Sequence, residues 1–296
     1  MTDTNLAFPT TRGRRIREFL FRAATVVALI LVIGPAVWIV AGIVARAVPH
    51  WRWSVITSSL QQTSGGLAGP IVGSLILMVG VLIVAGTVGV LAGLYLGELA
   101  RPRRNGKTGG SILRTASEVL SGFPSIVLGY VGYVALVVGL GWGFSLLPAV
   151  LILSMMVVPY IAKSTETAIR QVPTNYREGA EALGMSMGYG LRKVVLKSAA
   201  PGIVTGLLLA LAIAGGETAP LIYTASFTSK VPVGLIHTHG FPYLTYVVFS
   251  FFQLPNKQAN YLAFDAAVIL LVIVLLLLVA SRIIVARTQR YAEGRQ

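Results

Sequence analysis

Cysteine is absent from this chain of 296 residues, and charged side chains make up only 11% of it. The lack of cysteine excludes a disulfide framework, a thiol nucleophile and a cysteine-based metal site. Soluble domains carry about 25% charged residues, and disordered chains are poor in apolar ones. Here 55% of the residues are hydrophobic and the mean hydropathy is +0.78. The composition excludes both classes and predicts an integral membrane protein.

Long apolar runs define the predicted architecture. A helix that crosses the hydrocarbon core needs about 20 mostly apolar residues, whereas a β-barrel needs short segments of alternating polarity. Six runs reach the helical length, so we predict an all-α, polytopic membrane bundle of six transmembrane helices. Glycines spaced by four, as in Gly93–Gly97 and Gly202–Gly206, predict close packing between helices. The predicted spans are Ala23–Ala45, Pro70–Leu96, Ala116–Val138, Phe144–Ala162, Pro201–Thr224 and Leu262–Ala286.

The basic residues are unevenly divided among the loops. Five precede the first span, five lie between Arg101 and Arg114, six between Lys163 and Lys197, and four from Arg282 onward; the other loops hold only four. Cytoplasmic loops carry the excess of Lys and Arg, so we predict that both termini and the two basic loops are cytoplasmic. The net charge of +14 then reflects membrane orientation and contact with anionic headgroups, and no nucleic-acid partner is expected.

The basic segment 163–200 is too polar to span the membrane but carries helix signals. Thr174 marks the start of one short helix, and Gly184 ends it as a left-handed glycine. Ser186 marks the start of a second helix. Two short helices joined at a glycine form a protrusion suited to docking in another protein's groove. On spacing alone, a solvated loop on the lipid headgroups is an equal alternative.

Glu217 is the most unusual residue of the predicted fifth span. An ionised carboxylate among about 20 apolar residues costs several kcal/mol unless it is paired or hydrated. Gly215 and Gly216 before it and Pro220 after it weaken the helix, and unwound backbone at membrane depth occurs where it is buried in protein or lines a cavity. We predict that Glu217 lines a transport pathway. The alternative is a structural carboxylate held by a Ser, Thr or Arg of a neighbouring helix.

Other chemical signals are weaker. Glu98 and Glu118 lie near cytoplasmic span ends, where a carboxylate is easily tolerated, so we predict structural roles. His237 and His239 have no third ligand close in sequence, and no metal site is expected. The sequence Gly106–Thr108 resembles the end of a P-loop but lacks the required earlier glycine, so no nucleotide site and no enzymatic activity are expected. The apolar segment Phe241–Phe252 is too short to span and is predicted to form an aromatic belt at the outer interface.

Two kinds of motif carry a family resemblance. Glu178-Gly179-Ala180, followed after three residues by Gly184 and after nine more by Val194-Val195-Leu196, resembles the EAA loop of ABC-importer permeases. Gly179, Val194 and Lys197 depart from that pattern. More specific resemblance, to phosphate permeases of the PstA family, lies in Gly93–Glu98, Ser121–Val127 and Gly216–Leu221.

The resemblance implies a type I ABC-importer permease fold in the bacterial plasma (inner) membrane. Its implied partners are a PstC-like second permease, a pair of PstB-like ATPases that bind the ATP, and an external PstS-like phosphate-binding protein; no cofactor is implied for this chain itself. The implied division is a cytoplasmic tail (1–22), a first helix with its outer loop (23–64), a permease core (65–286) and a second tail (287–296). The implied coupling residues, within 163–200, are Glu178, Gly179, Ala180 and Gly184.

The same resemblance implies phosphate import, with Pro124, Ser125, Glu217 and Thr218 in the substrate pathway. Phosphate at neutral pH still carries a proton that it can donate to Glu217, whereas sulfate does not. Many PstA-like chains have Arg where this chain has Ile213, so the cation that balances the anion is expected from elsewhere. A permease for sulfate or molybdate, and an ATP-independent secondary transporter, remain as alternatives.

Overall fold

The computed structural model describes residues 12–100 and 110–293, which divide into two units. The first unit, residues 1–50, contains α1 (Arg12–Ala47) and the 3-10 turn η1 (Val48–His50). Helix α1 begins well before the predicted start of the span at Ala23, because the arginines and leucine of the basic tail are good helix formers. The predicted cytoplasmic tail is therefore partly helical.

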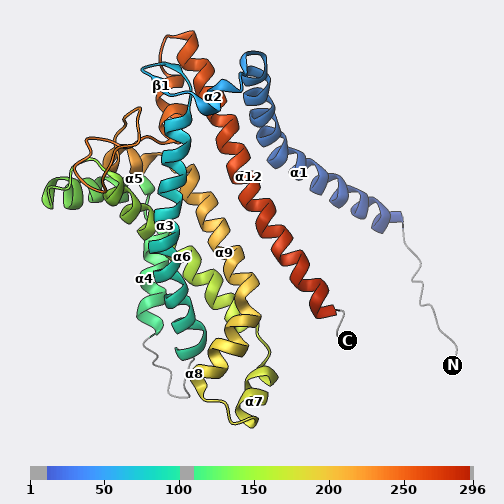
Figure 1. Cartoon of the computed structure of the whole chain (residues 1–296). Helices are drawn as coiled ribbons and strands as arrows, with labels where there is room; N and C mark the ends of the chain where they lie inside the picture. Colours follow the sequence, from blue (N-terminus) through green and yellow to red (C-terminus); the bar gives the residue numbers. More distant parts are fainter. Residues whose placement is uncertain (1–11, 101–109, 294–296) are drawn as a thin grey trace. The chain divides into compact units, whose positions relative to one another are not determined.

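The second unit, residues 51–296, is built mainly from helices (Figure 1). The elements η2 to η5 are π-helical turns that adjoin α-helices. In chain order the unit contains α2 (Ser54–Thr57), β1 (Leu60–Gln61), β2 (Ser64–Gly65), α3 (Ala68–Leu94), η2 (Tyr95–Leu99), α4 (Gly110–Gly122), α5 (Ser125–Gly132), η3 (Tyr133–Gly139), α6 (Leu146–Arg170), α7 (Thr174–Ala182), α8 (Met187–Gly190), η4 (Leu191–Val195), α9 (Leu196–Gly216), α10 (Ala219–Thr224), α11 (Leu244–Tyr246), η5 (Val247–Phe251) and α12 (Lys257–Glu293).

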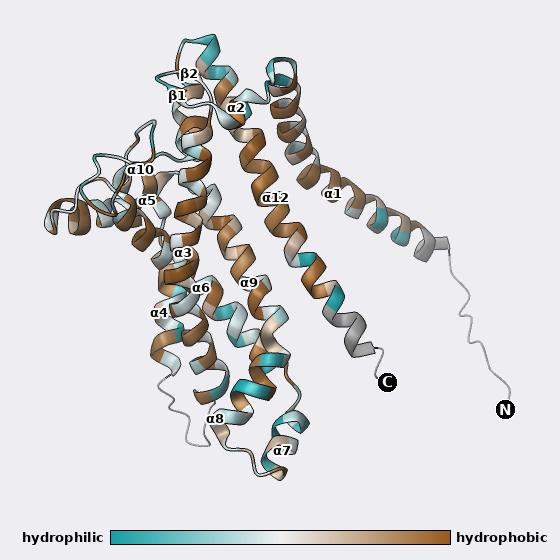
Figure 2. Cartoon of the chain, in the orientation of Figure 1, coloured by the Kyte–Doolittle hydropathy of each residue, from teal (hydrophilic) through white to brown (hydrophobic). Residues whose placement is uncertain are grey.

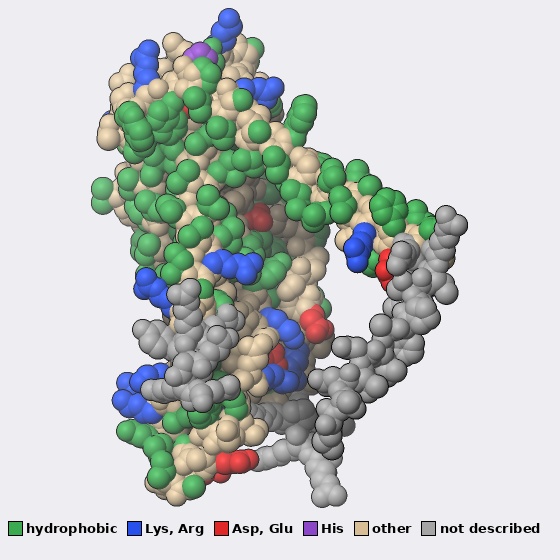
Figure 3. Space-filling model, turned by 90° about the vertical axis from the view of Figure 1, so that its right-hand side faces the viewer, with side chains coloured by type: hydrophobic (Ala, Val, Ile, Leu, Met, Phe, Trp, Pro, Cys, Tyr) green, Lys and Arg blue, Asp and Glu red, His purple; other side chains and the backbone are tan. Residues whose placement is uncertain are grey.

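The structure confirms that the helices of the bundle are long and apolar enough to span a membrane. Among the described residues, five helices are long and apolar enough to cross a membrane, and the bent pair of α4 with α5–η3 makes six if it counts as one span. Hydrophobic residues cover α3, α9 and α12 along most of their length, whereas α7 is polar (Figure 2). On the face shown in Figure 3, hydrophobic side chains cover much of the upper and middle part, and Lys and Arg side chains gather below them. The chain is a multi-pass membrane protein.

Helix α6 packs between α3 and α9, and glycines allow the close approach. A β-carbon at Gly93 would lie 2.5 Å from the Ala162 carbonyl oxygen, and one at Gly202 would lie 2.7 Å from the Ala168 β-carbon. Either would force the helices apart. The close packing predicted from the glycine repeats is confirmed, and α6 supplies much of the buried core.

The prediction of one continuous helix over the third span, Ala116–Val138, is wrong. The chain bends by 100° between α4 and α5–η3, and Pro124 lies at the break with an extended ψ of 131°. Proline lacks the amide hydrogen that a continuing helix needs, and it disfavours helical backbone at the residue before it. Pro124 therefore ends one helix and starts another instead of producing a mild kink.

The outer segment Phe241–Phe252 also differs from its prediction as an aromatic belt. Phe241, Tyr243 and Leu244 are at most 1% exposed. Phe227 stacks on Tyr246, with ring centroids 4.2 Å apart, and the segment packs against the first part of α12. The segment is too short to span, but burial against neighbouring helices removes more apolar surface from water than an interfacial position does. Its first part, Phe241–Val247, belongs to the core, whereas Phe249 and Phe252 are exposed.

The predicted loop 163–200 is helical at both ends. Helix α6 continues to Arg170, and the helix that begins at Met187 runs through η4 into α9 without a break. The connection therefore consists of α7 and the turn around Gly184. Gly184 has a φ of +70°, as predicted, and the second of the two predicted short helices is the start of a spanning helix.

Candidate functional site

A break in the fifth span places Glu217 at the centre of the site. Helix α9 ends at Gly216, Glu217 adopts extended backbone, and α10 begins at Ala219. The unwinding predicted from the glycine pair and Pro220 is confirmed. The Thr245 hydroxyl donates a hydrogen bond to the freed Glu217 carbonyl oxygen at 2.9 Å. Unwound backbone at this point is therefore held by the protein, as membrane depth requires.

The break in the third span meets the break in the fifth. The side chain of Ser125, the first residue of α5, lies beside the half-buried Glu217 carboxylate. Helix α5 packs on α10 so closely that a β-carbon at Gly129 would lie 2.5 Å from the Pro220 α-carbon. Two short helices that follow two breaks thus bring Ser125 and Glu217 together across a long stretch of sequence.

The other two predicted pathway residues border the same breaks. Pro124 is exposed and immediately precedes α5, and half-buried Thr218 immediately precedes α10. The Thr218 carbonyl accepts hydrogen bonds from the amides of Leu221 and Ile222. Both residues therefore have a clear role in shaping the breaks. Their contact with a substrate stays a prediction.

The charge that would balance an anion is not supplied beside Glu217. Within residues 12–100 and 110–293, no ion pair joins Glu217 to a basic side chain. Ile213, at the position where many relatives of the resembled family have Arg, packs against the apolar core of α3, α6 and α9. A cation for this site has to come from another part of the described bundle or from another subunit.

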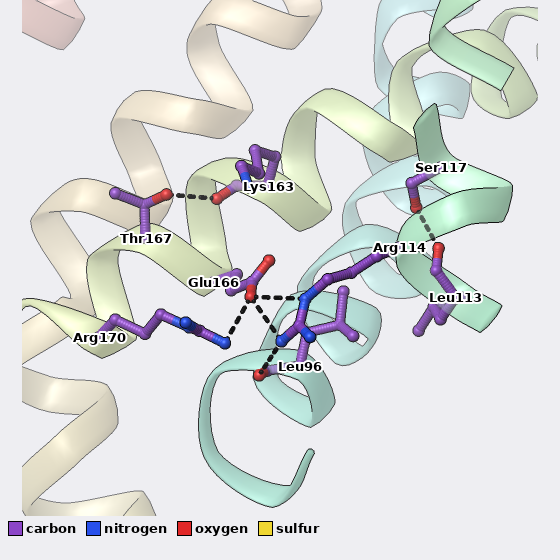
Figure 4. A network of polar contacts seen from close by, with 8 residues as sticks. All are labelled: Leu96, Leu113, Arg114, Ser117, Lys163, Glu166, Thr167 and Arg170. Atoms are coloured by element: carbon purple, nitrogen blue, oxygen red, sulfur yellow. Dashed lines mark hydrogen bonds and ion pairs between the residues drawn. The ribbon is translucent and has the colours of Figure 1, made fainter. Parts of the chain in front are cut away.

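The sequence analysis did not predict a charged cluster where α4, α6 and η2 meet. The Glu166 side chain is 5% exposed, and one of its oxygens, Oε1, accepts from Arg114 Nη2 at 3.0 Å and pairs with Arg170 Nη2 at 2.9 Å. Figure 4 shows its second oxygen turned away from both guanidinium groups. Arg114 also donates to the Leu96 carbonyl oxygen at 3.4 Å. The i, i+4 spacing of Glu166 and Arg170 was a local signal, but it lay in a segment interpreted as loop.

A second ion pair connects α7 to the bundle. Arg177 Nη2 lies 3.1 Å from Glu98 Oε2, and both side chains are only 12% exposed. The same guanidinium donates to the carbonyl oxygens of Ile169 at 2.9 Å and Val172 at 2.6 Å. The structural role predicted for Glu98 is confirmed, and Arg177 ties α7 to the ends of α3 and α6.

The coupling residues predicted from the EAA resemblance divide into exposed and buried positions. Glu178 and Gly179 are exposed on α7, whereas Ala180 is 7% exposed and lies beside Gly190 of α8. Gly184 forms the left-handed turn that ends the segment. Ala180 and Gly184 therefore set the shape of this segment, and Glu178 remains available to a partner.

Large apolar side chains are exposed around the same turn. Exposed fractions reach 77% for Leu183 and 66% for Met187, with 53% for Tyr176 and for Tyr189. A cluster of exposed apolar side chains on a polar segment marks a protein-interaction surface more often than a solvated loop. The structure thus favours the docking interpretation over the headgroup-bound loop.

Gly179→Ala is expected to stabilise α7. No atom lies within 4 Å of the position that a β-carbon would take there, and an exposed helical Gly is less stable than Ala by about 0.5–1 kcal/mol. A rise in the thermal-unfolding midpoint of the purified protein, with transport retained, is the expected result. Gly184→Ala is the matched control, and it should lower the midpoint because its φ of +70° strains any other side chain. A lower midpoint for Gly179→Ala would contradict this account of the exposed face.

Comparisons with known proteins agree with this architecture. The family model for the binding-protein-dependent transport system inner membrane component matches residues 89–290. The phosphate transport system permease protein PstA 2 of Mycobacterium bovis is 54% identical over 256 residues, which cover 86% of this chain and 83% of the relative. The probable phosphate transport system permease protein PstA of Methanocaldococcus jannaschii is 32% identical and covers 86% of this chain and 89% of that one.

A solved structure shows the fold independently. A chain of a bacterial ABC transporter involved in the import of the acidic polysaccharide alginate superposes with a TM-score of 0.57 at 16% identity, covering 90% of this chain and 96% of its own. The bundle has the fold of ABC-importer permeases. The chain belongs to the family of binding-protein-dependent transport system inner membrane components.

Proposed function

We propose that this chain is a transmembrane subunit of an ATP-driven importer of inorganic phosphate and forms half of its translocation pathway. The 54% identity to a phosphate permease across 86% of the chain is the observation that carries the choice of substrate. The meeting of Ser125 and Glu217 at two helix breaks gives that choice a chemical basis. Nothing in the bundle favours sulfate, molybdate or an ATP-independent mechanism.

Glu217 would select phosphate over fully deprotonated oxyanions by accepting a hydrogen bond from it. Phosphate at neutral pH retains a P–OH group that donates to a carboxylate, and a fully deprotonated oxyanion has no such donor and meets repulsion instead. The Ser125 hydroxyl lies beside this carboxylate and would hold it in position. Because the cation that balances the phosphate is not beside Glu217, we assign it to the partner permease, which would complete the site at the subunit interface.

The surface around Glu178 and Gly184 would dock an ATPase subunit. Exposed Leu183 and Met187 supply apolar contact area, and Glu178 supplies charge. Closure of an ATPase pair would move α7, and the Arg177–Glu98 ion pair would pass that movement to the ends of α3 and α6. The energy source, the ATP and its site would belong to these PstB-like partners. An external binding protein would deliver phosphate, and both termini would lie in the cytoplasm.

The function is tested by labelled phosphate uptake in a strain that lacks the chain. Wild type is expected to restore uptake, and Glu178→Lys to reduce it at least about tenfold, since a reversed charge at a docking contact costs more than 1.4 kcal/mol. Glu178 is exposed, so the change should leave folding and membrane levels intact.

Gln171→Lys is the control, because it adds a positive charge at the exposed end of α6 and should leave uptake unchanged. Uptake by Glu178→Lys at the wild-type rate would overturn the docking assignment and favour an ATP-independent transporter. Failure of the wild type to restore phosphate uptake would overturn the assignment of phosphate as the substrate.

A further inference from the structure

We propose that a second phosphate-binding site lies at the cytoplasmic end of the bundle, in the cavity between α4 and α6. The proposal rests on the proposed function for the source of its ligand, since phosphate leaving the pathway would occupy this site before release. The occupant is a free phosphate ion rather than the phosphate group of a lipid. The residues that bind it are Arg114, Ser117, Ser121 and Lys163.

The cavity has the size and the lining that such an ion needs. Its volume is about 290 Å³, and a water molecule takes about 30 Å³ in the liquid, so a small hydrated oxyanion fits. Arg114, Ser117, Ser121, Lys163 and Glu118 contribute polar groups to its wall, alongside apolar Leu96, Pro159 and Ala162. Phosphate is recognised by this combination of cations and hydroxyl groups.

The charge of the lining favours an anion. Buried Glu166 also lines the cavity, but Arg114 and Arg170 both bind it (Figure 4). With Lys163 and Glu118 included, the cluster holds three cations and two carboxylates, a net charge of +1. Exposed Glu118 is the remaining carboxylate, and it can accept the proton of a P–OH group, as we propose for Glu217. Lys163 is exposed, so its ammonium group can reach an ion in the cavity.

Two hydroxyl groups of α4 line this cavity on the side of the break at Pro124. Ser117 and Ser121 are one turn apart on α4, and each donates to a backbone carbonyl four residues earlier, at 2.9 and 2.8 Å. Their oxygens keep lone pairs for a P–OH donor, and rotation turns the hydrogen towards an anion. Helix α4 ends at Gly122, and beyond the bend at Pro124 Ser125 begins α5 beside Glu217. The α4 hydroxyl groups thus lie on the helix that leads from the cavity to the break.

Protection of an introduced cysteine tests the site directly, because the chain has no cysteine of its own. The assembled importer carrying Ser121→Cys would be labelled with a thiol reagent in vesicles of zwitterionic lipid, with inorganic phosphate or chloride at equal ionic strength. Phosphate is expected to slow the labelling severalfold, and Ser117→Cys repeats the test at a second wall position. Ser198→Cys, exposed and outside the cavity lining, should react equally in both salts.

Lys163→Gln tests whether the Lys163 ammonium group binds the phosphate ion. Loss of a charged hydrogen bond is expected to raise the phosphate concentration needed for half-protection about tenfold. Lys197→Gln removes an equally exposed charge away from the cavity and should not change it. Two results would overturn the proposed site. One is a labelling rate that phosphate does not change in either cysteine variant, and the other is a half-protection concentration that Lys163→Gln does not change.

Two further results distinguish the possible errors. If anionic lipid vesicles slow the labelling without phosphate, and phosphate has no effect in zwitterionic vesicles, the cavity binds a lipid headgroup and the proposal is wrong. Phosphate uptake by the same vesicles is measured in parallel. Absent protection with intact uptake rejects only the inner site, whereas absent uptake with intact protection rejects the proposed function.

Discussion

Glu217→Gln is expected to lower the preference for phosphate over sulfate by about 10- to 100-fold. Gln keeps the size of the side chain and can still bind Ser125, but it loses the charged acceptor for the P–OH group and gains donors that suit sulfate. A hydrogen bond to a charged group contributes about 1.5–3 kcal/mol, which corresponds to this range of ratios. Uptake of labelled phosphate and sulfate, at matched membrane levels of the protein, measures the effect.

Two further variants test whether the change in preference is specific to the Glu217 site. Glu181→Gln makes the same chemical change on exposed α7 and should leave the preference unchanged. Ser125→Ala removes the side-chain partner of Glu217 and should produce a smaller shift in the same direction. An unaltered phosphate-to-sulfate ratio in Glu217→Gln would show that the carboxylate is structural, which is the alternative that its position in the sequence allows.

Arg177→Met is expected to uncouple ATP hydrolysis from transport and to destabilise the end of the bundle at which α7 lies. The substitution leaves Glu98, which is 12% exposed, without this cation, and removes two hydrogen bonds to carbonyls near the end of α6. Breaking a buried ion pair by removing one partner costs about 3–5 kcal/mol. We expect uptake to fall at least about tenfold, with a lower thermal-unfolding midpoint and with ATP hydrolysis retained.

A double-mutant cycle distinguishes loss of the Arg177–Glu98 ion pair from general destabilisation of the protein. Glu98→Gln combined with Arg177→Met should be more stable than Arg177→Met alone, since the side chain that loses the Arg177 cation is then neutral. Arg192→Met, an exposed arginine on η4, controls for loss of a basic residue near the same segment. If Arg177→Met matched the wild type in midpoint and uptake, movement of α7 would have to reach the bundle by another route.

The sequence predicted most of the bundle because spanning helices are long apolar runs. It also predicted the break at Glu217, since Gly215, Gly216 and Pro220 all weaken the same helical turn. The left-handed turn at Gly184 followed from the same kind of local rule. These features depend on residues within one or two helical turns, which a single sequence displays.

Features that depend on contacts between distant segments were missed. The bend at Pro124 was missed, since Ala116–Val138 was predicted as one span and the bend depends on the packing of α5 against α10. Arg114 and Glu166 are 52 residues apart, and Arg177 and Glu98 are 79 apart, so no local spacing could pair them. The segment Phe241–Phe252 has the composition of an interfacial belt, and packing against the covering helices places its first part in the core.

Uptake by the purified importer tests the central claim most directly. The chain would be assembled with its partner permease and ATPase subunits in vesicles with ATP on the cytoplasmic side, and supplied with the external binding protein and either labelled phosphate or labelled sulfate. The account predicts ATP-dependent accumulation of phosphate, little sulfate, and loss of accumulation in Glu178→Lys. Sulfate accumulation equal to that of phosphate, or phosphate uptake without ATP, would contradict it.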